Sequence, residues 1–258
     1  AQNSEYAARF RDLGALPERV QVGGSIKFDG VETHCDNDRT QGFRELLGVT
    51  AEEMVLIAGS TQSPEEAAVL AAWEAALQRY PKLRLILVPR HLERFDEVAA
   101  LIEARGHRVL RRSQLGKSIA TDRGATGTVL LWDTIGELAA VWGLADLAYV
   151  GGSLTPGRGG QNMLEPAAYG AAVLFGPHTE NFRSIVESLM RQGAAVVVPS
   201  AEGLRAAVMR LLDQPEERRE LGERAREAVI AEQGATQRTL AALASFVPKP
   251  KIQRHRAA

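Results

Sequence analysis

A short apolar segment followed by a turn and then a helical segment recurs along this chain, and this repetition constrains its fold most. Met54 to Ala58 and Leu83 to Val88 run apolar without alternation, which is typical of strands buried on both faces. Each run is followed by glycine, proline or polar residues and then by residues with helical periodicity. Strands that alternate with helices in this way predict βαβ units and a parallel sheet.

The same pattern places further elements along the chain. We expect additional strands at residues 109–110, 129–131, 147–150, 172–175 and 194–198. We expect helices at residues 4–13, 43–47, 93–104, 135–143, 164–169, 182–192, 202–212 and 216–231, and one that opens with an N-cap at Ser63. The predicted fold class is therefore α/β: a doubly wound, Rossmann-like parallel sheet with right-handed crossovers.

Composition and charge exclude several classes of protein. The 258 residues are 45% hydrophobic and 24% charged, as in ordinary globular proteins. Because 31 Lys and Arg residues balance 32 Asp and Glu residues, we expect no nucleic-acid partner. No apolar run is long enough to predict a transmembrane helix. The one cysteine, Cys35, predicts a reducing, cytoplasmic compartment.

Chemically distinctive residues follow several of the predicted strands. Ligands of open parallel sheets bind at the carboxyl ends of the strands, where loops lead into helices. The segments at those positions are Gly59-Ser60-Thr61, Pro89-Arg90-His91, Gly151-Gly152-Ser153 and the loop at residues 155–162 that leads to Glu165. We expect all four to converge on one rim of the sheet.

The residue types on this rim suit an anionic ligand with a sugar hydroxyl pair. Glycines allow close approach of the backbone, and Arg90 carries a guanidinium suited to phosphate or carboxylate. Glu165 lies at the start of a helix, where its carboxylate can accept hydrogen bonds from a ribose diol. Each residue also has a structural alternative: turn geometry for the glycines, an ion pair with Glu93 for Arg90, and a helix-dipole contact for Glu165.

Two further patterns do not indicate a site. Asp36-Asn37-Asp38 and His34-Cys35 lie in a polar linker and lack further ligands at metal-binding spacing, so we expect no metal ion. The chain has no GxGxxG fingerprint, P-loop lysine or Gly-x-Ser-x-Gly elbow. Dinucleotide oxidoreductases, P-loop NTPases and serine acyl transferases therefore receive no support.

Seven motifs in order resemble those of the 3-deoxy-D-manno-octulosonic acid (Kdo) transferases, a family of GT-B glycosyltransferases. The resemblance covers most of the chain. The motifs are Gly24-Ser25-Ile26-Lys27-Phe28-Asp29, Ala58 to Thr61, Val88 to His91 with Glu93-Arg94-Phe95, Asp133 to Leu138, Val150 to Leu154, Asn162-Met163-Leu164-Glu165-Pro166, and Phe175 to His178 with Asn181-Phe182.

The resemblance implies metal-independent transfer of Kdo from CMP-Kdo to a lipid A precursor at the inner face of the inner membrane. It also implies that this chain is the donor-binding, C-terminal half of a GT-B fold, without a cofactor. We expect residues 1–45 to be the tail of an N-terminal domain and the crossover, and residues 46–246 the Rossmann-like domain. Residues 247–258 would form a basic tail. The general base is expected outside this chain.

The resemblance also implies roles for single residues. Thr134, Ile135, Gly136, Glu137 and Leu138 would hold the cytosine edge, and Glu165 the ribose. Ser60, Gly152, Ser153 and Asn162 would surround the phosphate, and Arg90 would be the catalytic residue that faces the phosphate or the sugar carboxylate. The remaining residues expected to bind the nucleotide sugar are Lys27, Gly59, Thr61, Pro89, His91, Gly151 and Leu164.

The chain departs from the family pattern at Gln161, where a histidine is usual. Glutamine cannot titrate, so only a hydrogen-bonding role is expected there. Two alternatives stay open: another GT-B enzyme, such as a UDP-sugar transferase or a sugar-nucleotide epimerase, and a nucleotide-binding module without catalysis of its own. Base preference and an activity assay distinguish them.

Overall fold

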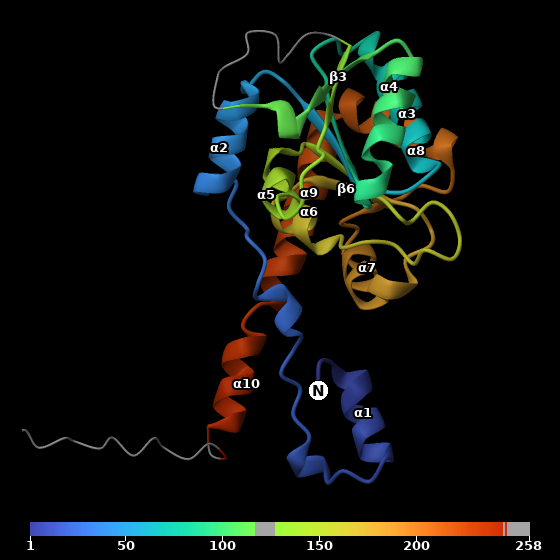
Figure 1. Cartoon of the computed structure of the whole chain (residues 1–258). Helices are drawn as coiled ribbons and strands as arrows, with labels where there is room; N and C mark the ends of the chain where they lie inside the picture. Colours follow the sequence, from blue (N-terminus) through green and yellow to red (C-terminus); the bar gives the residue numbers. More distant parts are fainter. Residues whose placement is uncertain (117–126, 245, 247–258) are drawn as a thin grey trace, which may run out of the picture. The chain divides into compact units, whose positions relative to one another are not determined.

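Seven parallel strands form one sheet in the part of the chain that the structure describes. The computed structural model describes residues 1–116, 127–244 and 246 (Figure 1). The strand order is β3-β4-β2-β1-β5-β6-β7, and every neighbouring pair is parallel. The strands are β1 (Val55–Thr61), β2 (Arg84–Pro89), β3 (Arg108–Arg111), β4 (Thr128–Leu131), β5 (Leu147–Val150), β6 (Ala172–Phe175) and β7 (Val196–Val197). The predicted doubly wound sheet is confirmed.

The central strands are buried on both faces, as their continuous apolar character predicts. Ile57 of β1 is in register with Ile86 of β2 and with Ala148 of β5, and these residues have no exposed surface. Alternate residues face the other side. There Leu56 and Leu85 belong to a core cluster with Trp73 of the following helix.

Helices cover both faces of this sheet. The long helices are α2 (Asp38–Leu47), α3 (Glu65–Leu77), α4 (Phe95–Ala104), α7 (Arg183–Arg191), α8 (Ala201–Asp213) and α9 (Pro215–Glu232). Helices α3, α4 and α8 lie together on one face, while α5 (Leu138–Val141), α6 (Leu164–Ala168) and α2 lie on the other (Figure 1). No helix in the described ranges has the length and apolarity to cross a membrane.

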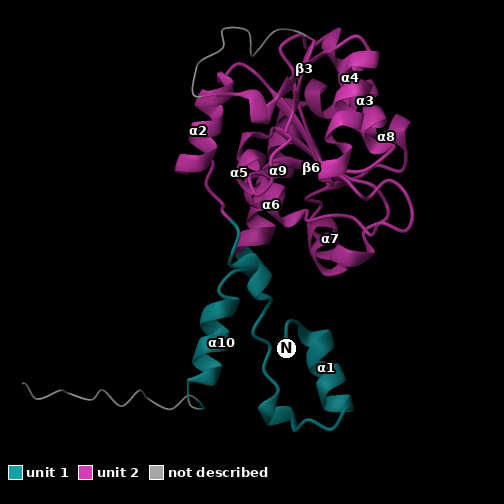
Figure 2. Ribbon diagram, in the orientation of Figure 1, with its two compact units in different colours: residues 1–31, 231–258 teal, residues 32–230 magenta. Residues whose placement is uncertain are grey.

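The chain forms two compact units (Figure 2). The larger unit, residues 32–230, contains the whole sheet. The smaller unit joins residues 1–31 to residues 231–258, and its described helices are α1 (Ser4–Asp12) and α10 (Ala235–Leu243). The larger unit therefore begins before residue 46, where we expected the Rossmann-like domain to start, and it ends before residue 246.

The smaller unit is held together by the Gly24 to Asp29 motif. Asp29 accepts hydrogen bonds from the backbone N–H groups of Gly234, at 2.7 Å, and Thr236, at 2.5 Å. Asp29 thereby satisfies two N–H groups at the start of α10. Gln233 donates from its side chain to the carbonyl of Phe28 at 3.1 Å. These hydrogen bonds join the two stretches of chain that make up the smaller unit.

Most predicted helices differ from the observed ones by one to three residues at an end, and three differences are larger or change the helix start. Helix α2 begins at Asp38, five residues early, because Asn37 accepts a hydrogen bond from the Thr40 N–H and so caps a polar first turn. Helix α3 lacks the expected serine cap, since Pro64 occupies that position without a side-chain bond. Helix α10 was not predicted. The basic tail at residues 247–258 lies outside the described residues.

Candidate functional site

The sheet changes winding direction at β1. Strand β1 lies between β2 and β5, so the connections from these strands leave in opposite directions. In open parallel sheets the crevice that binds ligands lies at such a point, outside the carboxyl ends of the strands. Two backbone hydrogen bonds join the loops there: Arg90 N–H to the Thr61 carbonyl and Gly151 N–H to the Gly59 carbonyl, each 2.9 Å. The three segments predicted after β1, β2 and β5 therefore meet at one rim.

The end of β1 is packed closely and has an unusual backbone. A Cβ added at Gly59 would lie 2.3 Å from Cζ2 of Trp142, so only glycine leaves space for that ring. Ser60 has φ +55°, in the left-handed region that serine rarely adopts. Backbone strain of this kind gathers at ligand sites. Thr61 is fully buried, and its hydroxyl has no hydrogen-bond partner among the described residues.

A buried carboxylate holds the turn that follows β5. Glu65, the first residue of α3, has no exposed surface. Its oxygens accept hydrogen bonds from the backbone N–H groups of Gly152 at 2.7 Å, Ser153 at 2.9 Å and Leu154 at 3.0 Å. The Ser153 hydroxyl is also used internally, since it donates to the Val150 carbonyl at 2.6 Å.

This arrangement changes the expected phosphate environment. We expected the amides of Gly152 and Ser153 to face a phosphate, but both donate to Glu65 instead. These residues can line the rim, yet those two N–H groups are not free to bind an anion. Among the described residues, Arg90 is a cationic group of this edge whose side chain has no partner in the protein.

Arg90 is exposed directly after β2, and His91 follows it. The Arg90 side chain makes no hydrogen bond or ion pair with the residues that the structure describes. The alternative of an ion pair with Glu93 is not observed in these ranges, because Glu93 lies instead 4.0 Å from the His91 ring. Arg90 therefore presents a guanidinium that is free to bind a ligand. Pro89 before it is buried.

The loop after β4 is fixed by an internal network. Glu137 accepts hydrogen bonds from Thr134 Oγ1 at 2.5 Å, Trp132 Nε1 at 3.0 Å and Arg112 Nη2 at 2.9 Å. Ile135 at the tip is 71% exposed. The Glu137 side chain thus shapes the loop, and the apolar tip offers a surface against which a base can stack.

The other end of this segment reaches β1. Gly136 has φ +80°, and its carbonyl accepts a hydrogen bond from Arg39 at 3.2 Å. Leu138, the first residue of α5, has Cδ1 3.2 Å from the Cβ position of Gly59. Residues 134–138 and the end of β1 therefore lie side by side.

Glu165 lies in the first turn of α6 and is mostly buried. Asn162 Nδ2 donates to its Oε1 at 3.1 Å, and Asn162 Oδ1 accepts from the Leu164 N–H at 3.1 Å. Burial raises the pKa of Glu165, although hydrogen bonds from Asn162 and the Trp142 side chain oppose that rise. Since Trp142 also packs against Gly59, the expected ribose residue is linked to the end of β1.

One predicted site residue belongs to the smaller unit. Lys27 is exposed on the turn Ile26–Phe28 of the smaller unit, so its part in the site stays a prediction. The remaining predicted residues belong to the larger unit. In that unit, Arg158 of the long loop donates to the Gln62 side chain and to the Ser63 carbonyl, which joins the loops after β5 and β1.

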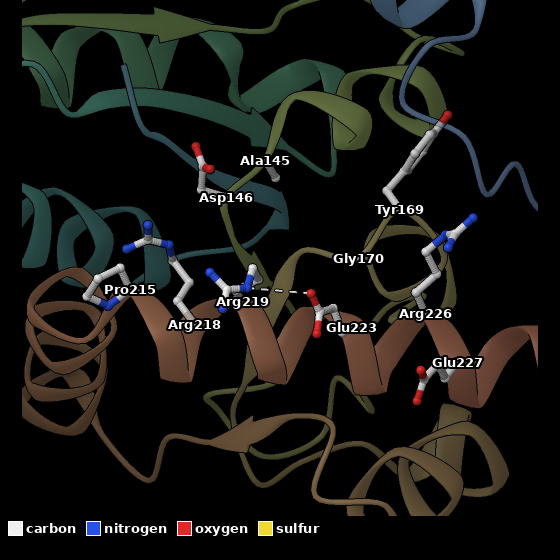
Figure 3. A pocket seen from close by; sticks show the side chains of 10 residues that line it. All are labelled: Ala145, Asp146, Tyr169, Gly170, Pro215, Arg218, Arg219, Glu223, Arg226 and Glu227. Atoms are coloured by element: carbon white, nitrogen blue, oxygen red, sulfur yellow. Dashed lines mark ion pairs between the residues drawn. The ribbon is translucent and has the colours of Figure 1, made fainter. Parts of the chain in front are cut away.

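A cavity lies at the opposite edge of the sheet, at the amino ends of the strands. This cavity of about 490 Å³ lies beside α9, and Figure 3 shows Arg218, Arg219 and Glu223 on the helix below Asp146. Asp146 directly precedes β5, so the cavity is at the amino end of the strand. None of the predicted donor-site residues lines it.

Sequence reasoning missed two residues that build the rim. Glu65 is one of two acidic residues in the first turn of a predicted helix, and acidic residues are common there, so its position does not indicate a site. Trp142 gave no signal beyond a place in an apolar helix. Neither side chain reveals its role by spacing, since both act across the sheet on residues far away in the sequence.

Comparisons with known proteins agree with this geometry. Residues 155–244 match a family model described as "Glycosyl transferase-like". The chain is 35% identical over 257 residues to a 3-deoxy-D-manno-octulosonic acid transferase of Haemophilus influenzae, covering 99% of this chain and 57% of that protein. The chain therefore spans little more than half the length of that relative.

Two solved structures are similar. The C-terminal CMP-Kdo binding domain of WaaA from Acinetobacter baumannii is 31% identical, with a TM-score of 0.65 over 73% of this chain and 95% of that chain. WaaG, a glycosyltransferase involved in lipopolysaccharide biosynthesis, is 16% identical, with a TM-score of 0.52 over 93% of this chain and 60% of that one, and shows the fold alone.

The predicted fold class, one half of a GT-B fold, is confirmed by these likenesses together with the seven-stranded parallel sheet. The identity shared with the WaaA domain extends over nearly all of that domain. The chain belongs to the Kdo transferase family.

Proposed function

We propose that this chain is the donor-binding half of a glycosyltransferase that transfers Kdo from CMP-Kdo to a lipid A precursor. The observation that carries the proposal is the free guanidinium of Arg90 at the strand-end crevice, in a chain 31% identical to a CMP-Kdo binding domain. The acceptor and the general base belong to the part of the enzyme outside this chain. The working enzyme then acts at the membrane surface that holds its lipid acceptor.

Each part of CMP has a suitable neighbour on the rim. The cytosine lies against Ile135 and the backbone of residues 134–138, and Glu165 accepts hydrogen bonds from the ribose hydroxyls. The phosphate lies near Ser60 and Asn162, within reach of Arg90. His91 is exposed on the same rim, and the buried residues Thr61 and Gly151 support it from below.

Arg90 has the central role in the chemistry. When the bond between Kdo and the phosphate oxygen breaks, negative charge develops on the leaving CMP. A guanidinium already in place stabilises that charge in the transition state more than in the bound donor. This step needs only groups of the protein, with no metal ion drawn into it.

Titration of the chain by CMP and, separately, UMP tests this function. We expect CMP to bind more tightly than UMP, and Arg90→Ala to weaken CMP binding about tenfold, the usual loss for a charge-assisted hydrogen bond. The control is Arg205→Ala, which replaces an exposed arginine of helix α8 and should leave the affinity unchanged. Preference for UMP would instead favour a UDP-sugar enzyme.

A further inference from the structure

We propose that Glu65 is a positioning residue of the donor site, whose carboxylate fixes the turn at residues 151–154 before any donor binds. The inference rests on the proposed function, because the donor is expected to lie against this turn. Glu65 itself has no exposed surface and does not touch the donor.

The carboxylate of Glu65 accepts each of the hydrogen bonds that it forms with the described residues. Oε2 accepts from the N–H of Gln62 at 2.9 Å and of Gly152 at 2.7 Å. Oε1 accepts from the Tyr149 hydroxyl at 2.9 Å and from the N–H groups of Ser153 and Leu154. Because hydrogen-bond donors face both oxygens, the site fits a carboxylate. A glutamine side chain here would place its NH₂ group, itself a donor, against backbone N–H groups.

The negative charge of Glu65 is balanced by dipoles. Among the described residues it forms no ion pair with Lys, Arg or His. It lies instead at the N-terminus of α3, a helix of 13 residues whose dipole favours an anion there. The four backbone N–H groups complete the environment that a bound anion would otherwise find. The Glu65 carboxylate thus takes the position, among these N–H groups, that the anionic group of a ligand would take in an anion-binding site.

The turn held by Glu65 connects the rest of the rim. The Gly152 carbonyl accepts from the Gly160 N–H at 2.7 Å, and Ser153 Oγ accepts from the Gly176 N–H at 2.8 Å. The first bond joins the turn to the loop that leads to Glu165, and the second joins it to the end of β6. Loss of Glu65 therefore disturbs the ribose side of the site as well as the turn.

Amide hydrogen exchange of the wild-type chain gives the first test and needs no nucleotide. If Glu65 holds the turn, the amides of residues 152–154 exchange within about tenfold of the rate of those in β5, because both must wait for opening of the structure. Exchange as fast as that of Gly157, an exposed residue of the following loop, would overturn the proposal.

The variant Glu65→Gln gives the second test. We expect exchange at residues 152–154 to quicken about tenfold or more and CMP affinity to fall about tenfold, because two or more charge-assisted bonds are lost. Tyr149→Phe removes one donor and leaves the amide bonds, so its CMP affinity should change less than about threefold. If Glu65→Gln does not fold, the same measurements on Glu65→Asp, together with the wild-type exchange pattern, decide whether Glu65 holds the turn.

A stability control separates positioning from a general loss of folding energy. Leu211→Ala removes buried apolar volume from α8, away from the rim, and should lower stability while CMP affinity stays unchanged. An equal loss of affinity in Leu211→Ala and Glu65→Gln would overturn the positioning role. If the wild-type chain binds no CMP, the proposed function fails, while the exchange results still decide the role of Glu65.

Discussion

Because Gly59 has no side chain, the ring of Trp142 can pack directly against the end of β1. A Cβ at this position would overlap the ring of Trp142 at 2.3 Å, and that ring also supports Glu165. Overpacking against a rigid indole forces strain, because a ring fixed by a buried core cannot give way.

We predict that Gly59→Ala lowers the free energy of unfolding by about 1–3 kcal/mol. The control is Gly42→Ala in α2, where an added Cβ meets nothing within 4 Å and the backbone is helical. Alanine in a helix stabilises by up to about 1 kcal/mol relative to glycine, so this control should be neutral or better. Urea unfolding of both variants measures the difference. Equal stabilities would contradict the close packing.

Glu165 should make nucleotide binding depend on pH. Burial raises its pKa above the ordinary value of 4.5, and only the carboxylate accepts hydrogen bonds from both ribose hydroxyls. We predict that CMP affinity falls as the pH is lowered from neutral toward the raised pKa of Glu165, because the carboxylate then becomes protonated. Glu165→Gln should bind more weakly and lose this pH dependence, as calorimetry at several pH values would show.

Unfolding linked to Glu165 would give the opposite trend. A raised pKa in the folded state means that this group favours folding at low pH and that this contribution is lost as the pH rises through the pKa. Weaker binding at low pH is therefore not a consequence of this carboxyl group destabilising the fold. If the pH dependence of CMP affinity is the same in Glu165→Gln as in the wild-type chain, Glu165 does not bind the ribose.

At the scale of elements, a buried ion pair joins the helices that flank Arg90. Arg94, whose side chain is 14% exposed, contacts Glu66 of α3 at 2.5 Å, and Glu66 is 1% exposed. Arg94 also contacts Glu97, which is 60% exposed. The buried partner fixes α4 against α3, while the exposed one adds little, because water screens it.

We predict that Glu66→Gln costs about 3 kcal/mol of stability, since it leaves the guanidinium partly buried with less compensation. Glu97→Gln should cost less than about 1 kcal/mol. Thermal unfolding of the two variants is the measurement. Similar losses for both would mean that burial of the Glu66 pair has no special weight.

Most elements of the sheet follow from sequence, because strands buried on both faces are continuously apolar. The predicted strands at 147–150 and 172–175 match β5 and β6 residue for residue. The end of β1 was predicted as a loop, but the strand runs through Gly59 to Thr61, where glycine and serine hide the signal. Helix α10 escaped prediction because its start depends on Asp29, some two hundred residues earlier.

The sequence predicted which segments meet at the candidate site, but it did not predict the hydrogen bonds between them. The strand-end rule locates Gly59 to Thr61, Arg90 and Gly151 to Ser153 on one rim, as the structure shows. The rule does not reveal that the carboxylate of Glu65 accepts hydrogen bonds from the backbone N–H groups that follow β5. That contact joins residues 87 positions apart, and no local pattern carries it.

At the scale of the whole molecule, this chain spans 57% of its Haemophilus influenzae relative. Under the proposed function, the chain is the donor-binding half and the general base belongs to the other half. We predict that the chain binds CMP and shows no Kdo transfer from CMP-Kdo to a lipid A precursor in a radiolabel assay. Measurable transfer by this chain alone would contradict that division of labour.

The most direct test of the donor site is the set of backbone amide NMR signals that shift when CMP is added to the chain. The account predicts shifts at residues 59–61, 89–91, 134–138, 151–153 and 162–165, all at the carboxyl ends of the strands. Shifts gathered instead around Asp146 and Arg218, in the cavity beside α9 (Figure 3), would place the nucleotide at the opposite edge of the sheet and contradict the central claim.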